Sequence, residues 1–167
     1  MPKLDFCQTK QIILATDFVF ERETLDKIIQ PSLEKVYLQC YLCKDVNPGL
    51  LVLQKCPNIK RISIRCFGPP DVPILTNNIL KEMLKTKRGK KIELFDFEYV
   101  SEIDPNDLIK LMDNHLDPIS FIYFLTLDAE FDACKQMFTK IQEIRPKIDH
   151  GIQIELESIS KSYKTFL

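Results

Sequence analysis

The sequence has little of what marks a membrane, secreted or nucleic-acid-binding protein. No apolar run approaches the roughly 20 residues that a membrane-spanning helix needs, and residues 1–5 lack the apolar core of a signal peptide. The 23 basic and 24 acidic residues nearly cancel, whereas nucleic-acid-binding domains usually carry a basic excess. Glycine is scarce, and no low-complexity stretch divides the chain. We therefore expect one globular domain over residues 1–167, in the cytoplasm or the nucleus.

Catalytic signatures are scarce as well. The sequence contains no G-x-S-x-G, no phosphate-binding G-x-x-x-x-G-K-[ST] and no G-x-G-x-x-G. His115 and His150 are the only histidines, and neither has a second metal ligand at helical spacing. His115 falls at the end of a predicted helix beside two aspartates, which predicts a solvated position. We expect a binding protein that uses no cofactor rather than an enzyme.

The cysteines offer two alternatives to that expectation. Cys40 and Cys43 follow a predicted strand and precede a helix start at Pro48, roughly where a thioredoxin-like pair lies. A thiol–disulfide oxidoreductase is therefore one alternative function. A zinc site that adds Cys56 and Cys66 is another hypothesis, although zinc cysteines usually come as two close pairs and only one pair here is close. We favour reduced thiols that are buried or lie in loops.

The strongest charge feature is the basic segment 85–91, Lys-Thr-Lys-Arg-Gly-Lys-Lys. It closes a predicted helix, where cations suit the helix dipole, and leads into a predicted strand. Nucleic-acid binding through this segment is a further alternative, although such runs are usually solvated ends of elements.

What the sequence does contain is a repeat. Six short segments place β-branched or bulky residues at alternate positions, the period of a half-buried strand. Their apolar anchors are Ile12, Val36, Ile62, Ile92, Ile122 and Ile152, and the last three intervals are equal at 30 residues. Helical patterns fill the gaps, and Asn47-Pro48 and Asp104-Pro105 each read as a helix N-cap followed by the first helical residue.

Two architectures suit alternating strands and helices. In a doubly wound sheet, helices cover both faces and the strands are apolar throughout. In a βα-repeat solenoid, helices cover only the convex side and the other strand face stays wet. The segments 62–65, 92–94 and 152–156 alternate apolar and polar residues. We therefore predict an α/β solenoid of about six parallel strands, with helices on the convex side.

The spacing of the apolar residues resembles a known family. Residues 33–38 read Leu-x-x-Val-x-Leu and residues 59–64 read Ile-x-x-Ile-x-Ile, which resemble the core of leucine-rich repeats. Residues 56–62 resemble the C-P-N-L-x-x-L phrase of the ribonuclease-inhibitor-like repeats in F-box substrate receptors, and residues 33–157 resemble the repeats of nematode F-box families. The resemblance implies a leucine-rich-repeat horseshoe in the ubiquitin pathway, which binds a ligase substrate or adaptor.

The sequence departs from those receptors in one respect, because no segment matches the F-box helix that docks the ligase adaptor. The resemblance therefore implies the target-binding half of such a receptor. We expect a protein–protein interaction module whose partner lies on the concave strand face, where aromatic and arginine residues are frequent anchors. The predicted partner-binding residues are Lys35, Tyr37, Arg61, Arg65, Lys91, Phe95, Phe121 and Tyr123. They predict an acidic or aromatic peptide, unless the aromatic residues lie under loops and the basic ones are only solvated.

Overall fold

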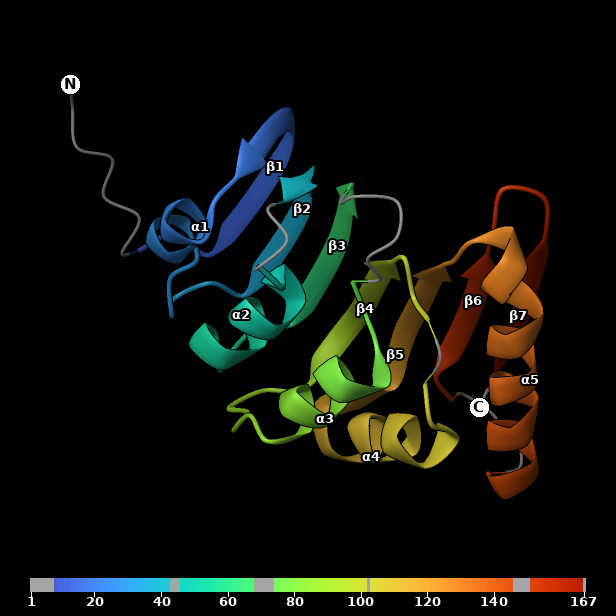
Figure 1. The fold of residues 1–167 in the computed structure, drawn as a ribbon. Helices are drawn as coiled ribbons and strands as arrows, with labels where there is room; N and C mark the ends of the chain where they lie inside the picture. The colour runs from blue at the N-terminus through green and yellow to red at the C-terminus, as the bar shows by residue number, and fades with distance from the viewer. Residues whose placement is uncertain (1–7, 43–45, 68–73, 102, 146–150, 167) are drawn as a thin grey trace.

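The computed structural model of the chain describes residues 8–42, 46–67, 74–101, 103–145 and 151–166. Strands and helices alternate along it until the last two strands (Figure 1). The elements are β1 (Gln11–Phe20), α1 (Arg22–Ile28), β2 (Lys35–Leu42), α2 (Pro48–Lys55), β3 (Arg61–Phe67), α3 (Asn77–Leu84), β4 (Ile92–Glu98), α4 (Pro105–His115), β5 (Leu116–Leu125), α5 (Asp128–Ile144), β6 (Gln153–Glu157) and β7 (Ser162–Phe166). The α/β class predicted from the alternating patterns is confirmed.

The order of the strands in the sheet is their order in the chain, from β1 to β7. Strands β1 to β6 are parallel, and β7 returns antiparallel to β6. Figure 1 shows the helices on the same side of the fan of strands. Right-handed connections between successive neighbours place helices on one side in this way. The sheet is therefore open, with β1 and β7 at its two edges among the described residues.

The core lies between the sheet and the helices. Val36 and Leu38 on β2 and Ile62 and Ile64 on β3 point into it and are fully or almost fully buried. They lie in register, with Val36 beside Ile62 and Leu38 beside Ile64. The residues between them point to the opposite face, as the period of a strand requires. The helix side of the sheet is thus apolar, and the opposite face carries the polar residues of the alternation.

Strand β4 differs from the sequence prediction in register. The neighbour of Ile62 is Phe95 rather than Ile92, and Phe95 in turn lies beside Ile122. The pairing shifts between Ile92 and Leu94, and both Ile92 and Phe95 are fully buried. A shift by three positions, an odd number, exchanges the two faces of a strand. The predicted partner-binding role of Phe95 is therefore wrong, because its side chain packs in the core.

The last repeat also departs from the equal spacing. Ile154, not Ile152, lies beside Ile122 in the sheet, but this shift of two positions leaves the predicted faces unchanged. Strand β7 was not predicted. It pairs with β6, and its Tyr163 hydroxyl donates to Oε1 of Gln142 on α5 at 3.1 Å. The C-terminal end of the sheet is therefore covered by an antiparallel strand held against a helix.

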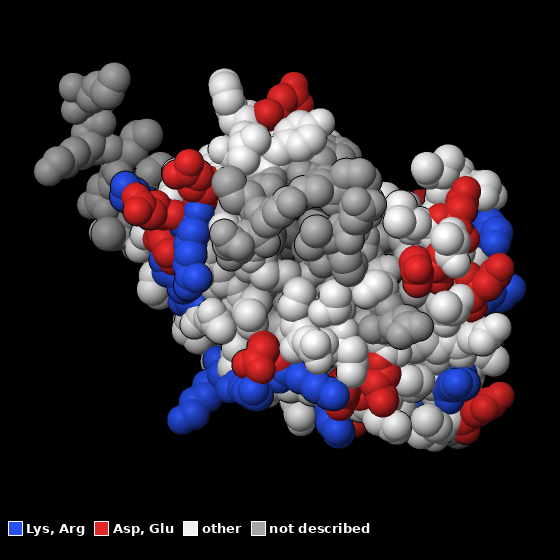
Figure 2. All heavy atoms as spheres, viewed as in Figure 1, with Lys and Arg blue, Asp and Glu red and all other residues white. Residues whose placement is uncertain are grey.

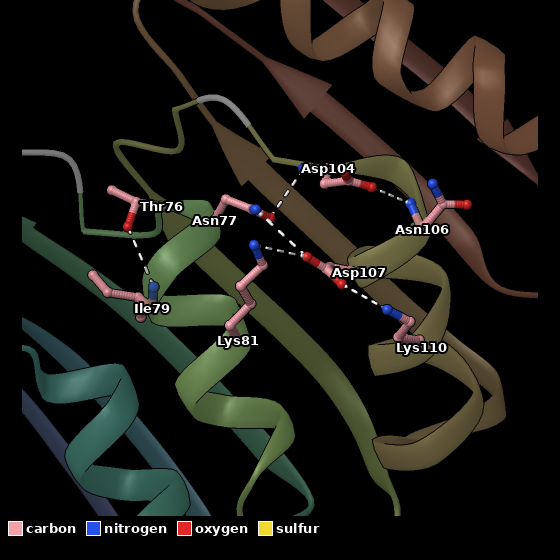
Figure 3. Close-up of polar contacts among 8 residues, drawn as sticks. All are labelled: Thr76, Asn77, Ile79, Lys81, Asp104, Asn106, Asp107 and Lys110. Carbon is pink, nitrogen blue, oxygen red and sulfur yellow. Dashed lines mark hydrogen bonds and ion pairs between the residues drawn. The ribbon is translucent and has the colours of Figure 1, made fainter.

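Asparagine side chains tie the start of one helix to the segment before the next. Asn47 caps α2 by accepting from the backbone N–H of Leu50 at 2.9 Å, and its amide donates to the carbonyl of Ile74 at 2.7 Å. Asn77, at the start of α3, accepts from the backbone N–H of Asp104 at 3.0 Å (Figure 3). Both ties span 27 residues. The predicted N-caps Asn47 and Asp104 are confirmed.

A buried carboxylate joins α3 to α4 beside these caps. Asp107 accepts from Lys110 at 2.9 Å, forms an ion pair with Lys81 at 3.7 Å, and accepts from the Asn77 amide at 3.5 Å (Figure 3). The hydrogen bond from Lys110 contributes most to lowering the pKa of Asp107, and the Lys81 and Asn77 contacts act in the same direction. We call Asp107 with Asn77, Lys81 and Lys110 the helix-side cluster.

His115 is not solvated, contrary to the sequence prediction. The last turn of α4 exposes Asp113 and Asn114 but buries His115, and strand β5 begins directly after it at Leu116. His115 is only 5% exposed. Burial lowers its pKa, and the positive charge of Arg88 acts in the same direction. His115 is therefore a core residue that favours its neutral form.

Candidate functional site

The sheet face away from the helices, which we call the open face, carries the polar and aromatic side chains of the strands. A groove of about 500 Å³ crosses it, from Ile13 on β1 to Glu155 on β6. The register brings Tyr37, Ser63, Asp96 and Tyr123 into one row across four neighbouring strands. The open face comprises Gln11, Ile13, Ala15, Lys35, Tyr37, Gln39, Arg61, Ser63, Arg65, Leu94, Asp96, Glu98, Phe121, Tyr123, Leu125, Gln153, Glu155 and Glu157.

Most of the predicted partner-binding residues lie on this face. They are Lys35, Tyr37, Arg61, Arg65, Phe121 and Tyr123. Two do not. Phe95 is fully buried in the core. Lys91 is exposed but precedes β4, and its ammonium donates to the carbonyl of Asp113 at 2.7 Å. Lys91 therefore fixes the end of α4 rather than facing the groove.

Asp96 lies at the centre of the groove and was missed by the sequence prediction. Its Oδ2 accepts from the Ser63 hydroxyl at 2.6 Å and from Nε and Nη2 of Arg65, each at 3.2 Å. Its other oxygen, Oδ1, is buried without a hydrogen-bond partner among the described residues. The signal that could have found it is the alternation of Phe95 and Phe97, which places Asp96 on the opposite face.

Arg65 and Tyr123 extend this cluster toward β6. The guanidinium carbon of Arg65 lies 5.3 Å from the centre of the Tyr123 ring, within the range of a cation–π contact. The Tyr123 hydroxyl donates to Oε2 of Glu157 at 2.5 Å. Burial, followed by the hydrogen bond to Glu157, raises the pKa of Tyr123. The phenol therefore stays protonated and can hold Glu157 in place. We call Ser63, Arg65, Asp96, Tyr123 and Glu157 the open-face cluster.

Glu98 follows Asp96 on the same face of β4 and is only 7% exposed. Burial raises its pKa; the charge of Asp96 acts in the same direction, and the charge of Arg65 opposes both. The β4 part of the face therefore concentrates two buried acidic groups. The sequence prediction assigned this strand to Lys91 and Phe95, so it missed both carboxyl groups.

The charge of the open face also differs from expectation. The sequence analysis predicted Lys35, Arg61 and Arg65 among the partner-binding residues and expected an acidic or aromatic peptide. In the structure, Arg61 donates to Glu93 at 3.2 Å, Arg65 is bound to Asp96, and Lys164 forms an ion pair with Glu155. Because the arginines already contact carboxylates, the face is close to charge-balanced. From β2 to β6 its basic residues lie on β2 and β3 and its acidic residues on β4 and β6, and Lys164 of β7 lies beside Glu155.

Apolar surface lies next to these charges. The rings of Phe121 and Tyr123 lie nearly parallel at 17°, with their centres 6.5 Å apart. Both are half-buried and line the groove with Leu94 and Tyr37. Half-buried aromatic residues beside ordered polar groups are typical of the positions that contribute most of the binding energy in protein interfaces.

The described cysteines do not support the zinc hypothesis. Cys40 is buried near the end of β2, and Cys43 lies outside the described residues. Cys56 follows α2, and its thiol donates to the carbonyl of Gln30 at 3.2 Å. Cys66 lies near the end of β3, which at ~3.3 Å per residue places its backbone roughly 15 Å from the start of that strand, the end nearer to Cys56. Zinc requires its sulfur ligands within about 4 Å of one another.

The electrostatics of Cys56 and Cys134 favour the protonated thiol. Burial raises the pKa of Cys56 to about 11, and burial raises that of Cys134 to about 11 as well. A nucleophilic thiol needs a lowered pKa and access to solvent. Among the described residues, no group of three or more histidine, cysteine or acidic side chains lies close enough to hold a metal ion.

The basic segment 85–91 is partly used by the fold. Arg88 donates to the carbonyls of Cys56 at 2.9 Å and Ile59 at 2.6 Å, and burial lowers its pKa to about 10. Lys85 contacts Glu82 at 2.5 Å. Figure 2 shows basic side chains mixed with acidic ones along the lower edge of the view, below α2 and α3. Segment 85–91 therefore joins the ends of neighbouring repeats, and only part of its positive charge is available to solvent or to a partner.

Comparisons with family models, with curated proteins and with solved structures find no significant match for this chain. In the part of the chain that the structure describes, no helix has the length and apolar character to cross a membrane.

Proposed function

We propose that the open face is a protein-binding surface and that its groove holds an extended segment of a partner. The observation that carries this proposal is the open-face cluster. A sheet face turned toward solvent does not need a buried carboxylate at its centre, yet Asp96 is held there by Ser63 and Arg65. The ordered polar groups can fix the orientation of a bound segment, and the half-buried ring of Phe121 beside them supplies contact area.

The repeat architecture supports the same function. Neighbouring parallel strands in chain order, with helices on one side, are what a leucine-rich-repeat-like horseshoe requires. In such a solenoid the strands line the concave side, and extended binding surfaces form there. We therefore propose that the open face is the concave face of this type of fold.

The identity of the partner is proposed from the sequence resemblance. Residues 56–62 resemble a phrase in the repeats of F-box substrate receptors, and residues 33–157 resemble the repeats of nematode F-box families, so we propose a ligase substrate or adaptor as the partner class. The charge layout refines its chemistry. A segment lying across the strands meets basic residues on β2 and β3 and acidic residues on β4 and β6. A partner segment carrying both signs of charge and an apolar side chain fits this layout better than a purely acidic peptide.

The test is recovery of partners with the tagged chain, followed by binding measurements on the purified pair. Phe121→Ala and Tyr37→Ala each remove groove contact area without breaking a side-chain hydrogen bond of the open-face cluster. We expect each to weaken binding at least about tenfold. The matched control is Ile119→Ala, which removes a side chain that is 74% exposed and does not line the groove.

Unchanged affinity in both groove variants would contradict the placement of the site on the open face. Loss of binding in the Ile119→Ala control as well would point to another surface. Circular dichroism of all three variants checks that the fold is retained.

A further inference from the structure

The two edges of the sheet are built differently. Strand β7 is short, carries Lys164, and is held by Gln142 of α5 through the Tyr163 hydroxyl. Strand β1 has 10 residues and, within them, Asp17 is its only charged residue and there is no proline. Edge strands of monomeric proteins are usually short, charged, interrupted by proline or covered. By these criteria β7 is a protected edge. In β1 an irregularity between Ala15 and Val19 interrupts the pairing with β2, and the regular stretch from Gln11 to Ala15 before it has none of these protections.

The backbone of β1 has hydrogen-bonding groups directed away from the sheet. The carbonyl of Lys10 accepts from the N–H of Lys35 at 3.0 Å, so it points toward β2. Because successive residues of a strand point their backbone groups to opposite sides, those of Gln11, Ile13 and Ala15 point outward. None of the described residues pairs with them.

The side chains of β1 are also unusually apolar for an exposed edge. Ile13 is 64% exposed, Val19 59% and Phe18 77%. Of these, Ile13 precedes the irregularity in β1 and would lose contact with water if another strand extended the sheet along Gln11 to Ala15, which favours association.

We propose that β1 pairs antiparallel with β1 of a second copy of this chain, centred on Ile13. In that register Ile13 lies opposite Ile13 of the copy, and Gln11 lies opposite Ala15. These are the residues whose backbone groups point outward, so each finds its partners in the same two-fold arrangement. Ile12 then lies opposite Leu14, which keeps the helix-side residues of both sheets on one side.

This register explains why a second copy fits the edge. A two-fold interface needs a strand that is complementary to itself. From Gln11 to Ala15, β1 meets this need, because its outward backbone groups pair with those of the copy and its side chains keep to the same faces of the sheet. The resulting assembly has one continuous sheet and two open faces side by side. Ile13 also lies at the β1 end of the groove, but the inference does not depend on the proposed function, because the dimer forms through the backbone edge of β1 and its test uses the purified chain without another partner.

The experiment measures the mass of the purified chain by sedimentation over a range of concentrations. We expect a dimer in equilibrium with a monomer. In Ile13→Lys and in Ile13→Glu, the two-fold axis brings like charges directly opposite each other, which destabilises the pair. We expect each variant alone to dimerise at least about tenfold more weakly. Mixing the two variants places a lysine opposite a glutamate across the axis, and we expect dimers to return in the mixture.

The control is Phe166→Lys, which adds a positive charge to a 50%-exposed side chain on the β7 edge. We expect it to leave the monomer–dimer equilibrium unchanged. A wild-type chain that stays monomeric at all concentrations would overturn the proposal. A dimer that survives both Ile13 variants would overturn it too, and so would a failure of the mixed variants to pair while each retains its circular dichroism spectrum.

Discussion

The helix layer and the open face of the sheet each hold a buried aspartate, and the two carboxylates are satisfied in different ways. Asp107, in the helix-side cluster, uses both carboxylate oxygens, with Lys110 on one and Lys81 and Asn77 on the other. Asp96, in the open-face cluster, receives three hydrogen bonds on one oxygen and none from the described residues on the other.

The difference separates a structural tie from a candidate binding element. The lysine partners of Asp107 have side chains that are 54% and 60% exposed, so water can replace them if they leave. Asp96 has a side chain only 6% exposed, and its Ser63 partner is buried as well. A buried acceptor without a partner costs stability, and native proteins keep such groups mainly where function requires them. This contrast supports our proposal that the open face binds a partner.

The largest expected effect is that of Asp96→Ala. The substitution leaves the buried Ser63 hydroxyl without its acceptor and removes the carboxylate that holds Arg65 across β3 and β4. We expect the free energy of unfolding to fall by about 2–4 kcal/mol, measured by urea denaturation. A loss no greater than that of Asp107→Ala would break the comparison between the two clusters.

Asp107→Ala is expected to cost less, about 1–2 kcal/mol in the same measurement. Its lysine partners can turn to solvent, and the remaining loss is that of an acidic residue in the first turn of α4. Because the pKa of Asp107 is lowered in the folded state, its contribution is complete above the unfolded pKa of 3.8 and is lost as the pH falls through the folded value. The difference between wild type and Asp107→Asn should therefore shrink below about pH 4.

The smallest effect, and the one of opposite sign, is expected at Glu98. Its pKa is raised in the folded state, so ionisation opposes folding as the pH rises above the ordinary value of 4.5. Glu98→Gln removes this penalty, and we expect it to raise the thermal midpoint at pH 7 by a few degrees at most, which corresponds to about 1 kcal/mol or less. The gain should vanish below about pH 4.5. A stabilisation independent of pH would mean that burial of the charge is not its cause.

Much of the fold could be predicted because it depends on local patterns. Alternation identified the six parallel strands, and Asn47 and Asp104 marked helix starts through their capping side chains. Strand β7 was missed because Ser162–Phe166 is short and carries its polar residues on an edge. The sequence analysis predicted about six strands, the last of them anchored at Ile152, whereas β7 pairs with β6 as a seventh.

The candidate site was predicted only where the register was right. Arg65 and Tyr123 were placed on the correct face because β3 and β5 follow the alternation without interruption near them. The equal spacing through Ile92 misled the assignment of β4, since the irregularity before Leu94 turns Asp96 rather than Phe95 to the groove. The contact between Ser63 and Asp96 depends on that register, which no local pattern specifies.

The agreement between chain order and sheet order also bears on how this protein responds to force. Every strand pairs only with its neighbours in the sequence, so no pairing spans the whole molecule. A chain pulled by its two ends would detach one strand–helix unit after another instead of yielding in a single event. For the same reason, duplication or deletion of one internal unit would lengthen or shorten the sheet and still leave both of its end strands in place.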